Sequence, residues 1–368
     1  MKKTDLLISK TLLAWYDRCQ RILPWRKHPD PYRVWISEIM LQQTQVDIVI
    51  PYYHRFLKRF PDVAALAEAP LDDVLKAWEN LGYYARARNL RQTALILVKK
   101  FNGKLPDTWE AIITLPGIGN YTAGAILSIA FGKAVPAVDG NVRRVLSRLY
   151  AVREPVNQRE TQKRLHALAA SLIPKTAPGS FNQALMDLGA MICVPKSPAC
   201  ADCPLRIQCK ARQFGLQDLL PMPEKKPATP HERVTAAVIF NRQGQVMIVR
   251  RPARGLLASL WKFPGSIVKE KELLEEGLTR TVREELGIRI RAGKPLASVN
   301  HAYTHFRITL TAFRCFRRSG RPRALACQEW RWASPDDLEN LTFSKADRAV
   351  ISIMKLTAYN PPGRLLIR

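Results

Sequence analysis

The chain has 368 residues, which is enough for two domains rather than one small core. Hydrophobic residues form 47% of it, which argues against a disordered chain, and no apolar segment is long enough to cross a membrane. The 58 Lys and Arg against 31 Asp and Glu give a formal net charge of +27, and both halves of the sequence share this excess. The distribution favours contact with one long polyanion, although a basic surface without such a partner is the alternative.

The first 215 or so residues have the pattern of a mostly helical domain. Asp5 and Lys10 interrupt the apolar stretch after the initial Met-Lys-Lys, and no cleavage pattern follows, so we predict a helix there rather than a signal peptide. The segment ISEIMLQQTQV, residues 36–46, predicts a buried helix that contains one acid, Glu38, and then a block of uncharged hydrogen-bonding side chains.

A glycine-rich turn interrupts the helical pattern later in this domain. The sequence LPGIG, residues 115–119, is followed by YTAGAILSIAFG at helical spacing, and Asp139 precedes a further helix, NVRRVLSRLY. Gly117 and Gly119 allow a tight turn that brings backbone N–H groups and the next helix N-terminus to a DNA phosphate. A plain interhelical turn is the default for LPGIG alone, but Asp139, placed 20 residues after Gly119, favours the phosphate site.

Four of the seven cysteines lie within 17 residues near the end of the helical domain, namely Cys193, Cys200, Cys203 and Cys209. Four thiolates at this density can hold a zinc ion or an iron–sulfur cluster. Zinc modules usually pair two CxxC knuckles, whereas only Cys200 and Cys203 have that spacing, so the array favours a 4Fe-4S cluster. The odd total count, without a secretion signal, argues against a disulfide framework.

A change of composition marks the end of the helical domain. Because PMPEKKPATPHER is rich in Pro and charge, we assign residues 1–216 to a first domain, 217–232 to a linker and 233–368 to a second domain. Beyond the linker, RVTAAVIF and QVMIVRR predict the two strands of a hairpin, and HAYTHFRITLTAFRCF continues the strand-like alternation. With a last helix from about Ser344, the second domain is predicted to be an α+β module.

Together these motifs resemble a known family. LPGIGNYTAGAILSIAFG, AVDGNVRRVL and the C-x6-C-x2-C-x5-C array are similar to the helix-hairpin-helix DNA glycosylases that carry an iron–sulfur cluster, and LPWR, SEIMLQQTQV and LGYYARARN narrow the resemblance to adenine DNA glycosylases of the MutY type. The resemblance implies an all-α glycosylase domain with a 4Fe-4S cluster and base-excision repair of adenine mispaired with 8-oxoguanine or guanine. We expect double-stranded DNA as the partner of a monomer in a bacterial cytoplasm.

The expected reaction assigns roles to residues in the matched motifs. Departure of a purine requires an acid on the base and an anion near the oxocarbenium-like sugar. Glu38 lies in an apolar segment that favours its protonated form, and the resemblance implies the same role, general acid at adenine N7. Asp139, before a helix, is expected to stay ionised and stabilise the sugar, with Tyr121 and Asn141 orienting both groups. Taken singly, Glu38 is better explained as a helix charge and Asp139 as an N-cap.

Tyr121 also bears on strand cleavage. Bifunctional members of the superfamily have a lysine at this position, and its amine forms a Schiff base with the sugar, which a phenol cannot do. We therefore expect a monofunctional enzyme. The competing interpretations are a thymine-glycol type glycosylase–lyase and an iron–sulfur DNA-binding scaffold without activity.

The amides that follow Glu38 are predicted to hold the DNA open after the adenine has left the stack. Gln43 is expected to enter the stack, with Tyr83 as a wedge on the opposite strand, whereas capping of neighbouring loops is an equal alternative for Gln42 and Gln45. The family match assigns four residues to the adenine pocket: Trp25, Arg26, Leu41 and Gln183.

The second domain resembles the Nudix fold of nucleotide hydrolases through LWKFPGS and REELGI. Glu284 and Glu285 match the later acidic pair of that family, but Thr281 stands where its first glutamate should be and Lys271 replaces another, so we expect no Mg²⁺ cage and no hydrolysis. In adenine glycosylases such a domain recognises 8-oxoguanine, and the residues that match its recognition loop are Tyr303, Thr304 and His305. Burial of Tyr303 in the core is the alternative.

Overall fold

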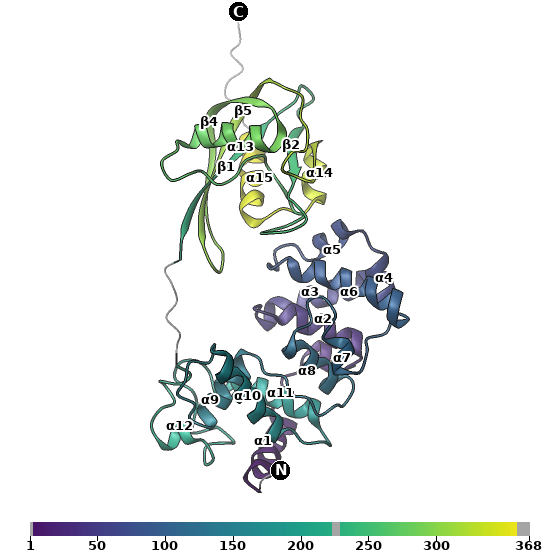
Figure 1. The fold of residues 1–368 in the computed structure, drawn as a ribbon, viewed down its shortest axis with the longest axis vertical. Coiled ribbons are helices and arrows are strands. Elements are labelled where there is room, and N and C mark those ends of the chain that lie inside the picture. The colour runs from purple at the N-terminus through teal and green to yellow at the C-terminus, as the bar shows by residue number, and fades with distance from the viewer. Residues whose placement is uncertain (1–2, 223–228, 359–368) are drawn as a thin grey trace, which may run out of the picture. The chain divides into compact units, whose positions relative to one another are not determined.

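The computed structural model describes residues 3–222 and 229–358, and the chain divides into two compact units (Figure 1). The first unit comprises Met1–Ala69 and Asn89–Lys226, and the second comprises Pro70–Arg88 and Pro227–Arg368. A short segment of the N-terminal region, 70–88, therefore packs with the C-terminal region. Residues 223–228 of the predicted linker lie outside the described residues.

The described part of the first unit is helical, as the sequence predicts. Its helices are α1 (Lys3–Cys19), the short 3₁₀ helix η1 (Pro24–Arg26), α2 (Pro31–Leu41), α3 (Val46–Arg59), α4 (Val63–Glu68), α6 (Ala85–Phe101, whose first turn belongs to the second unit), α7 (Trp109–Ile112), α8 (Asn120–Ile129), α9 (Gly140–Leu149), α10 (Arg159–Leu172), α11 (Pro178–Met191) and α12 (Lys210–Gln213). The predicted N-terminal helix and the helices after LPGIG and Asp139 are confirmed as α1, α8 and α9.

Helix α8 is central to the packing that positions the site. Its apolar sequence buries every residue from 122 to 128, and it packs between α2 and α11. Helix α9 presents Val142, Val145, Leu146 and Leu149 to the same core at helical spacing, and it packs on α11. The C-terminal part of α2 and the N-terminal ends of α8 and α9 are thereby fixed on a rigid framework.

The predicted helix over 36–46 is shorter than expected. Helix α2 ends at Leu41, and residues 42–45 form a loop before α3. Gln43 has a left-handed backbone, with φ of 55°, which a continuing helix does not allow, and the Thr44 N–H turns back to the Leu41 carbonyl at 3.2 Å. The amides therefore extend from a loop, and Glu38 lies in the last turn of the helix before it.

The second unit contains two three-stranded sheets, of order β1-β5-β4 and β3-β2-β6. Its elements are α5 (Leu71–Ala77), β1 (His231–Ile239), β2 (Val246–Arg250), β3 (Trp261–Lys262), α13 (Leu274–Leu286), β4 (Arg289–Ala302), β5 (Arg307–Ser319), β6 (Glu329–Ala333), α14 (Pro335–Asn340) and α15 (Lys345–Ala358). The last helix begins where the sequence predicts it, and the α+β class is confirmed.

The predicted hairpin of the first two strands is confirmed only beside its turn, where Phe240 and Val246 form one antiparallel bridge, and its longer strand pairing is wrong. Both strands and the turn between them exist, but β1 pairs in parallel with β5, whereas β2 joins β3 and β6 in the other sheet. Both faces of β1 are buried, because Ala237 and Ile239 pack in the core of α13 while Ala236 and Val238 pack in the core of α15. A strand that is apolar on both faces carries no alternation that would specify its partner.

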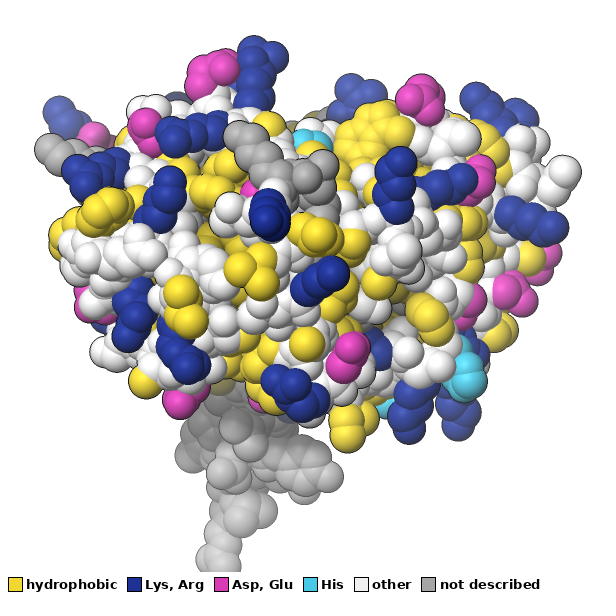
Figure 2. Space-filling model, turned by 90° about the horizontal axis from the view of Figure 1, so that it is seen from below, with side chains coloured by type: hydrophobic (Ala, Val, Ile, Leu, Met, Phe, Trp, Pro, Cys, Tyr) yellow, Lys and Arg dark blue, Asp and Glu magenta, His cyan; other side chains and the backbone are white. Residues whose placement is uncertain are grey.

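The surface is basic, in agreement with the composition. Lys and Arg side chains recur over the face shown in Figure 2, and Asp and Glu are fewer on it. Among the described residues, no helix combines the length and apolarity needed to span a bilayer.

Candidate active site

A cleft of about 1280 Å³ lies in the first unit, between the end of α2 with its following loop, the N-terminal ends of α8 and α9, and one face of α11. It brings together residues that are far apart in the sequence. Of the predicted site residues, its lining includes Trp25, Arg26, Glu38, Leu41, Gln43, Gly119, Tyr121, Asp139, Asn141 and Gln183.

Glu38 is a carboxyl group held away from water. It is only 5% exposed, and the Tyr121 hydroxyl donates a short hydrogen bond to its Oε2. Burial raises the pKa of Glu38 to about 7, although the hydrogen bond from Tyr121 lowers it. A large fraction of Glu38 is therefore protonated near neutral pH, as general acid catalysis requires.

Asp139 is the N-cap of α9 and also lines the cleft. Its Oδ1 accepts a hydrogen bond from the Val142 N–H at 2.7 Å, and its Oδ2 accepts one from the Asn141 amide at 3.0 Å. Burial raises the pKa of Asp139, while these donors oppose the rise by stabilising the anion. The Asp139 carboxylate therefore caps α9 and also lines the cleft.

A chain of hydrogen bonds runs from Asp139 towards the cysteines. Asn141, which donates to Asp139, accepts from Arg144 at 2.9 Å, and Arg144 also donates to the backbone oxygen of Cys193 at 2.7 Å. Asn141 and Arg144 thus connect the Asp139 carboxylate to the backbone of the cysteine loop.

The four cysteines lie apart from the cleft. Burial, and then the charges of the other three cysteines, raise the pKa of Cys203 to about 11, so the four thiols are close enough to affect one another. Arg148 is 2% exposed and donates to Cys193 Sγ at 3.3 Å, which supplies a positive charge beside the sulfurs. Within 3–222 and 229–358, no cluster of three or more His, Cys, Asp or Glu is arranged for a single metal ion. Four thiols beside a buried cation are a donor set that suits an anionic iron–sulfur group.

The two glycines of LPGIG differ in what they require. Gly117 has φ of 80°, and a Cβ there would lie 2.8 Å from the Asn89 Cβ, so a side chain would strain the backbone and force its neighbour to shift. Gly119, the N-cap of α8, has an ordinary φ of −96°, and a Cβ there would meet no heavy atom within 4 Å. Its lack of a side chain leaves space on the cleft side for a ligand.

The loop after α2 contains two different kinds of amide. Gln42 donates to the Thr122 hydroxyl at 3.1 Å and so ties the end of α2 to α8, which agrees with the structural interpretation of this residue. Gln43 is exposed and lines the cleft. Gln45 is exposed and lines the same cleft, so a ligand there can meet both Gln43 and Gln45.

The remaining predicted DNA contacts lie in the second unit. A cavity of about 420 Å³ is lined by Tyr83, Tyr303, Thr304 and His305, and the hydroxyls of Tyr83 and Thr304 share a short hydrogen bond. Tyr83 has a left-handed backbone with φ of 47°, whereas Thr304 and His305 lie in the turn between β4 and β5. Tyr303 is half-buried and stacks on Phe306 at 4.7 Å, so its ring belongs partly to the core.

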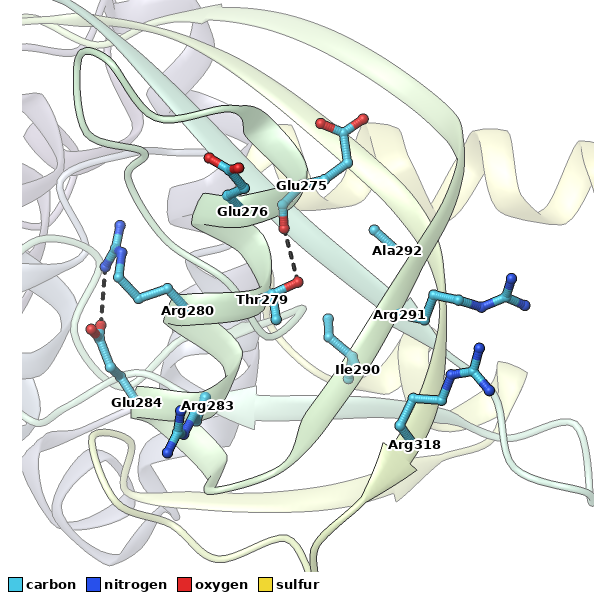
Figure 3. A pocket seen from close by; sticks show the side chains of 10 residues that line it. All are labelled: Glu275, Glu276, Thr279, Arg280, Arg283, Glu284, Ile290, Arg291, Ala292 and Arg318. Atoms are coloured by element: carbon cyan, nitrogen blue, oxygen red, sulfur yellow. Dashed lines mark hydrogen bonds and ion pairs between the residues drawn. The ribbon is translucent and has the colours of Figure 1, made fainter.

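Figure 3 shows Glu275 and Glu276 in the first turn of α13, and Glu284 near the end of this helix beside Arg280. Glu285 is bound to Lys262 at 2.9 Å inside the unit, and Glu284 pairs with Arg280 at 3.1 Å on its surface. Arg280 also pairs with Glu272 at 2.7 Å. Thr281 is buried. Both acids of the later pair are therefore bound to cations.

Comparison with known proteins agrees with this arrangement. Residues 36–171 match the HhH-GPD superfamily of base excision DNA repair proteins, and residues 235–352 match the NUDIX domain. The chain is 33% identical to an adenine DNA glycosylase of Homo sapiens over 93% of this chain and 73% of that protein. The chain belongs to the adenine DNA glycosylase family. A Buchnera aphidicola adenine DNA glycosylase is 41% identical, over 74% of this chain and 77% of its own length. A solved structure of a thermostable thymine-DNA glycosylase, 31% identical, covers 58% of this chain and 98% of its own, with a TM-score of 0.53.

One residue of the glycosylase cleft region escaped the sequence analysis. Asp187 is fully buried and binds Arg26 through two hydrogen bonds of 2.8 and 3.0 Å, and Arg21 at 2.6 Å. Burial disfavours its charge, but the hydrogen bonds and charges of the two arginines lower its pKa. Arg26 thus lines the cleft as an arginine fixed by an ion pair. A single acid within the apolar helix LMDLGAM was the signal that could have identified it.

Proposed function

We propose that this chain hydrolyses the N-glycosidic bond of adenine mispaired with 8-oxoguanine or guanine in double-stranded DNA, acting as a monofunctional base-excision repair enzyme. The observation that carries the proposal is a buried acid with a pKa of about 7, Glu38, in the same cleft as the N-cap carboxylate Asp139. Departure of a purine requires an acid and an anion: burial favours the protonated form of Glu38, whereas hydrogen bonds from Val142 and Asn141 favour the anion of Asp139.

In the proposed mechanism the adenine leaves the duplex and enters the cleft, lined by Trp25, Arg26, Leu41 and Gln183. Glu38 gives its proton to adenine N7 as the bond to C1′ breaks, so that adenine leaves as a neutral base. The Asp139 carboxylate, held by Val142 and Asn141, stabilises the positive charge on the sugar until water adds at C1′. Tyr121 holds Glu38 and offers no amine for strand cleavage.

The DNA is proposed to be held open from two sides. Gln43, exposed beside the cleft, fills the space that the adenine leaves, and Tyr83 acts as the wedge on the opposite strand. Gly117 and Gly119 bring the backbone of the hairpin to a phosphate. Tyr303, Thr304 and His305 read the 8-oxoguanine, and the Nudix-like region hydrolyses no nucleotide.

A mismatch assay tests the activity. End-labelled duplexes that carry each adenine mispair are incubated with the full chain and analysed with and without alkali. We expect strand breaks only after alkali, and only in duplexes with adenine opposite 8-oxoguanine or guanine. Strand breaks of equal yield without alkali would contradict the monofunctional assignment, and no breaks in either condition would contradict the glycosylase activity.

We also propose that Cys193, Cys200, Cys203 and Cys209 hold a 4Fe-4S cluster, which fixes their loop to α9 through Arg144 and Arg148. Cys203→Ser should lose iron, inorganic sulfide and visible absorption, whereas Cys327→Ser, in the second unit, should keep all three. Zinc in place of iron would contradict the cluster. The enzyme is proposed to act as a monomer on DNA in a bacterial cytoplasm, and light scattering in solution would measure its mass.

A further inference from the structure

A second groove of the first unit adjoins the catalytic cleft. Its volume is about 710 Å³, and it shares four lining residues with the cleft, namely Asn120, Tyr121, Val138 and Arg143. The rest of its wall comes from Trp109 at the start of α7 and from one face of α10. The two hollows therefore meet at the N-terminal ends of α8 and α9, beside Glu38 and Asp139.

The face of α10 in this groove is defined by helical spacing. Arg159, Gln162, Lys163, His166 and Ala167 follow at intervals of three, one, three and one residues, which places them on one side of the helix. Arg159 and Lys163 are exposed, and His166 is half-buried. The surface that this helix adds to the groove is therefore cationic and able to donate hydrogen bonds.

The charge of the groove is one-sided. The lining residues that the structure describes include Arg143, Arg159 and Lys163 but no Asp or Glu, in contrast to the cleft, whose lining includes Glu38, Asp47 and Asp139. Lys163 pairs with Glu160 at 2.9 Å, but both side chains are largely exposed, so water screens this pair and the ammonium group can exchange partners at little cost. Such a groove favours an anionic ligand.

We propose that this groove binds the phosphodiester backbone of the adenine-bearing strand next to the flipped nucleotide. The inference rests on the proposed function, because the position of the target nucleoside is set by Glu38 and Asp139. A strand whose nucleoside lies in the cleft must continue past its rim, and the adjoining groove offers Arg143 at the junction and then Arg159 and Lys163 for the next phosphates. Trp109 adds an aromatic surface for a neighbouring sugar or base. Excised adenine is uncharged and has no need of these cations.

A pair of matched variants tests the groove in the full-length protein. Arg159→Gln with Lys163→Gln removes two cations from the groove, and Arg153→Gln with Arg164→Gln removes two exposed cations outside its lining. Each double variant has the same net charge and loses one exposed ion pair, Lys163–Glu160 or Arg164–Glu154. Binding is measured on a duplex with an uncleavable 2′-fluoro-adenosine opposite 8-oxoguanine.

We expect the groove variant to bind this duplex at least about tenfold more weakly at physiological salt, and the slope of log affinity against log salt to fall by about 1 to 2, since each phosphate contact contributes about 0.9. The control variant should lose less than about twofold. A neutral methylphosphonate at one or two linkages beside the adenosine should weaken binding by wild type and by the control but not by the groove variant.

Equal losses in both variants, or methylphosphonate effects that persist in the groove variant, would overturn the proposal. These outcomes are separate from failure of the proposed function. If no duplex loses adenine while the linkage-specific effect remains, the groove stands and the activity fails. If adenine is excised but the groove and control variants bind alike, only the groove fails.

Discussion

The short hydrogen bond between Tyr121 and Glu38 tunes the acid on which the proposed reaction depends. Because this bond lowers the pKa of Glu38, Tyr121→Phe should raise that pKa, and the decline of the excision rate with rising pH should move upward by up to about one pH unit. Single-turnover rates from pH 5 to 9 measure the shift. Met186→Leu, which changes the sulfur 3.8 Å from the same hydroxyl, is the control and should leave the profile in place. A downward shift in Tyr121→Phe would contradict the assignment.

Glu38 also makes stability depend on pH. Its pKa is about 7 in the folded chain against an ordinary value of 4.5, so between these values the unfolded chain loses its proton first and folding weakens as pH rises. Glu38→Gln cannot ionise, so it should melt several degrees higher than wild type at pH 8 and about equally at pH 4. Thermal melts of both proteins at the two pH values measure this difference.

The same variant tests the role of Glu38 as general acid. Glu38→Gln should bind duplex DNA but lose adenine excision by about a thousandfold or more. Single-turnover rates measure the loss, and a rate near that of wild type would contradict the role.

At the scale of elements, the turn that joins α7 to α8 depends on Gly117. Gly117→Ala combines a left-handed backbone with a close approach to Asn89, whereas Gly103→Ala has a similar φ of 73° with no heavy atom near its Cβ. The control should lose about 1 kcal/mol of stability from the backbone alone. Gly117→Ala should lose more, and it should weaken duplex binding because the hairpin shifts. Urea unfolding of both variants measures the difference, and equal losses would show that the contact with Asn89 is readily relieved.

The sequence predicts the elements that a local pattern of residues specifies. It misses the features that depend on contacts with distant parts of the same chain. Helices α8 and α9 can be predicted from the spacing of their apolar residues and from Asp139 as a helix start signal. The motifs that line the cleft lie at the ends of predicted helices, where side chains are free to face a ligand. The end of α2 at Leu41 does not follow, because a left-handed Gln43 leaves no trace in composition. The pairing of β1 with β5 does not follow either, because β1 is apolar on both faces. Asp187 was missed because its role comes from arginines about 160 residues away.

At the scale of the whole molecule, residues 70–88 belong with the C-terminal region although the sequence places them far from it. Asp72 pairs with Arg250 at 2.5 Å, and Glu79 pairs with Arg348 at 2.7 Å. These ion pairs hold the segment that carries Tyr83 against the turn that carries Thr304. The unit is therefore assembled from two distant parts of the chain. Its cavity is lined both by Tyr83, the proposed wedge, and by the proposed lesion-reading residues 303–305.

The hydrogen bond between Tyr83 and Thr304 leads to a prediction about substrate preference. We expect the Thr304 hydroxyl to contribute to the preference for adenine opposite 8-oxoguanine over adenine opposite guanine. Thr304→Ala removes the group that bonds to Tyr83 and that faces the proposed 8-oxoguanine, whereas Thr304→Ser keeps a hydroxyl at the same position. The ratio of single-turnover rates for adenine opposite 8-oxoguanine and opposite guanine should fall about fivefold in Thr304→Ala, the equivalent of about 1 kcal/mol for one hydrogen bond. Thr304→Ser should keep most of the ratio, and excision opposite guanine should change little in either variant, because Glu38 and Asp139 lie in the other unit. An unchanged ratio in Thr304→Ala would exclude this hydroxyl from lesion recognition and leave it the role of a tether for Tyr83.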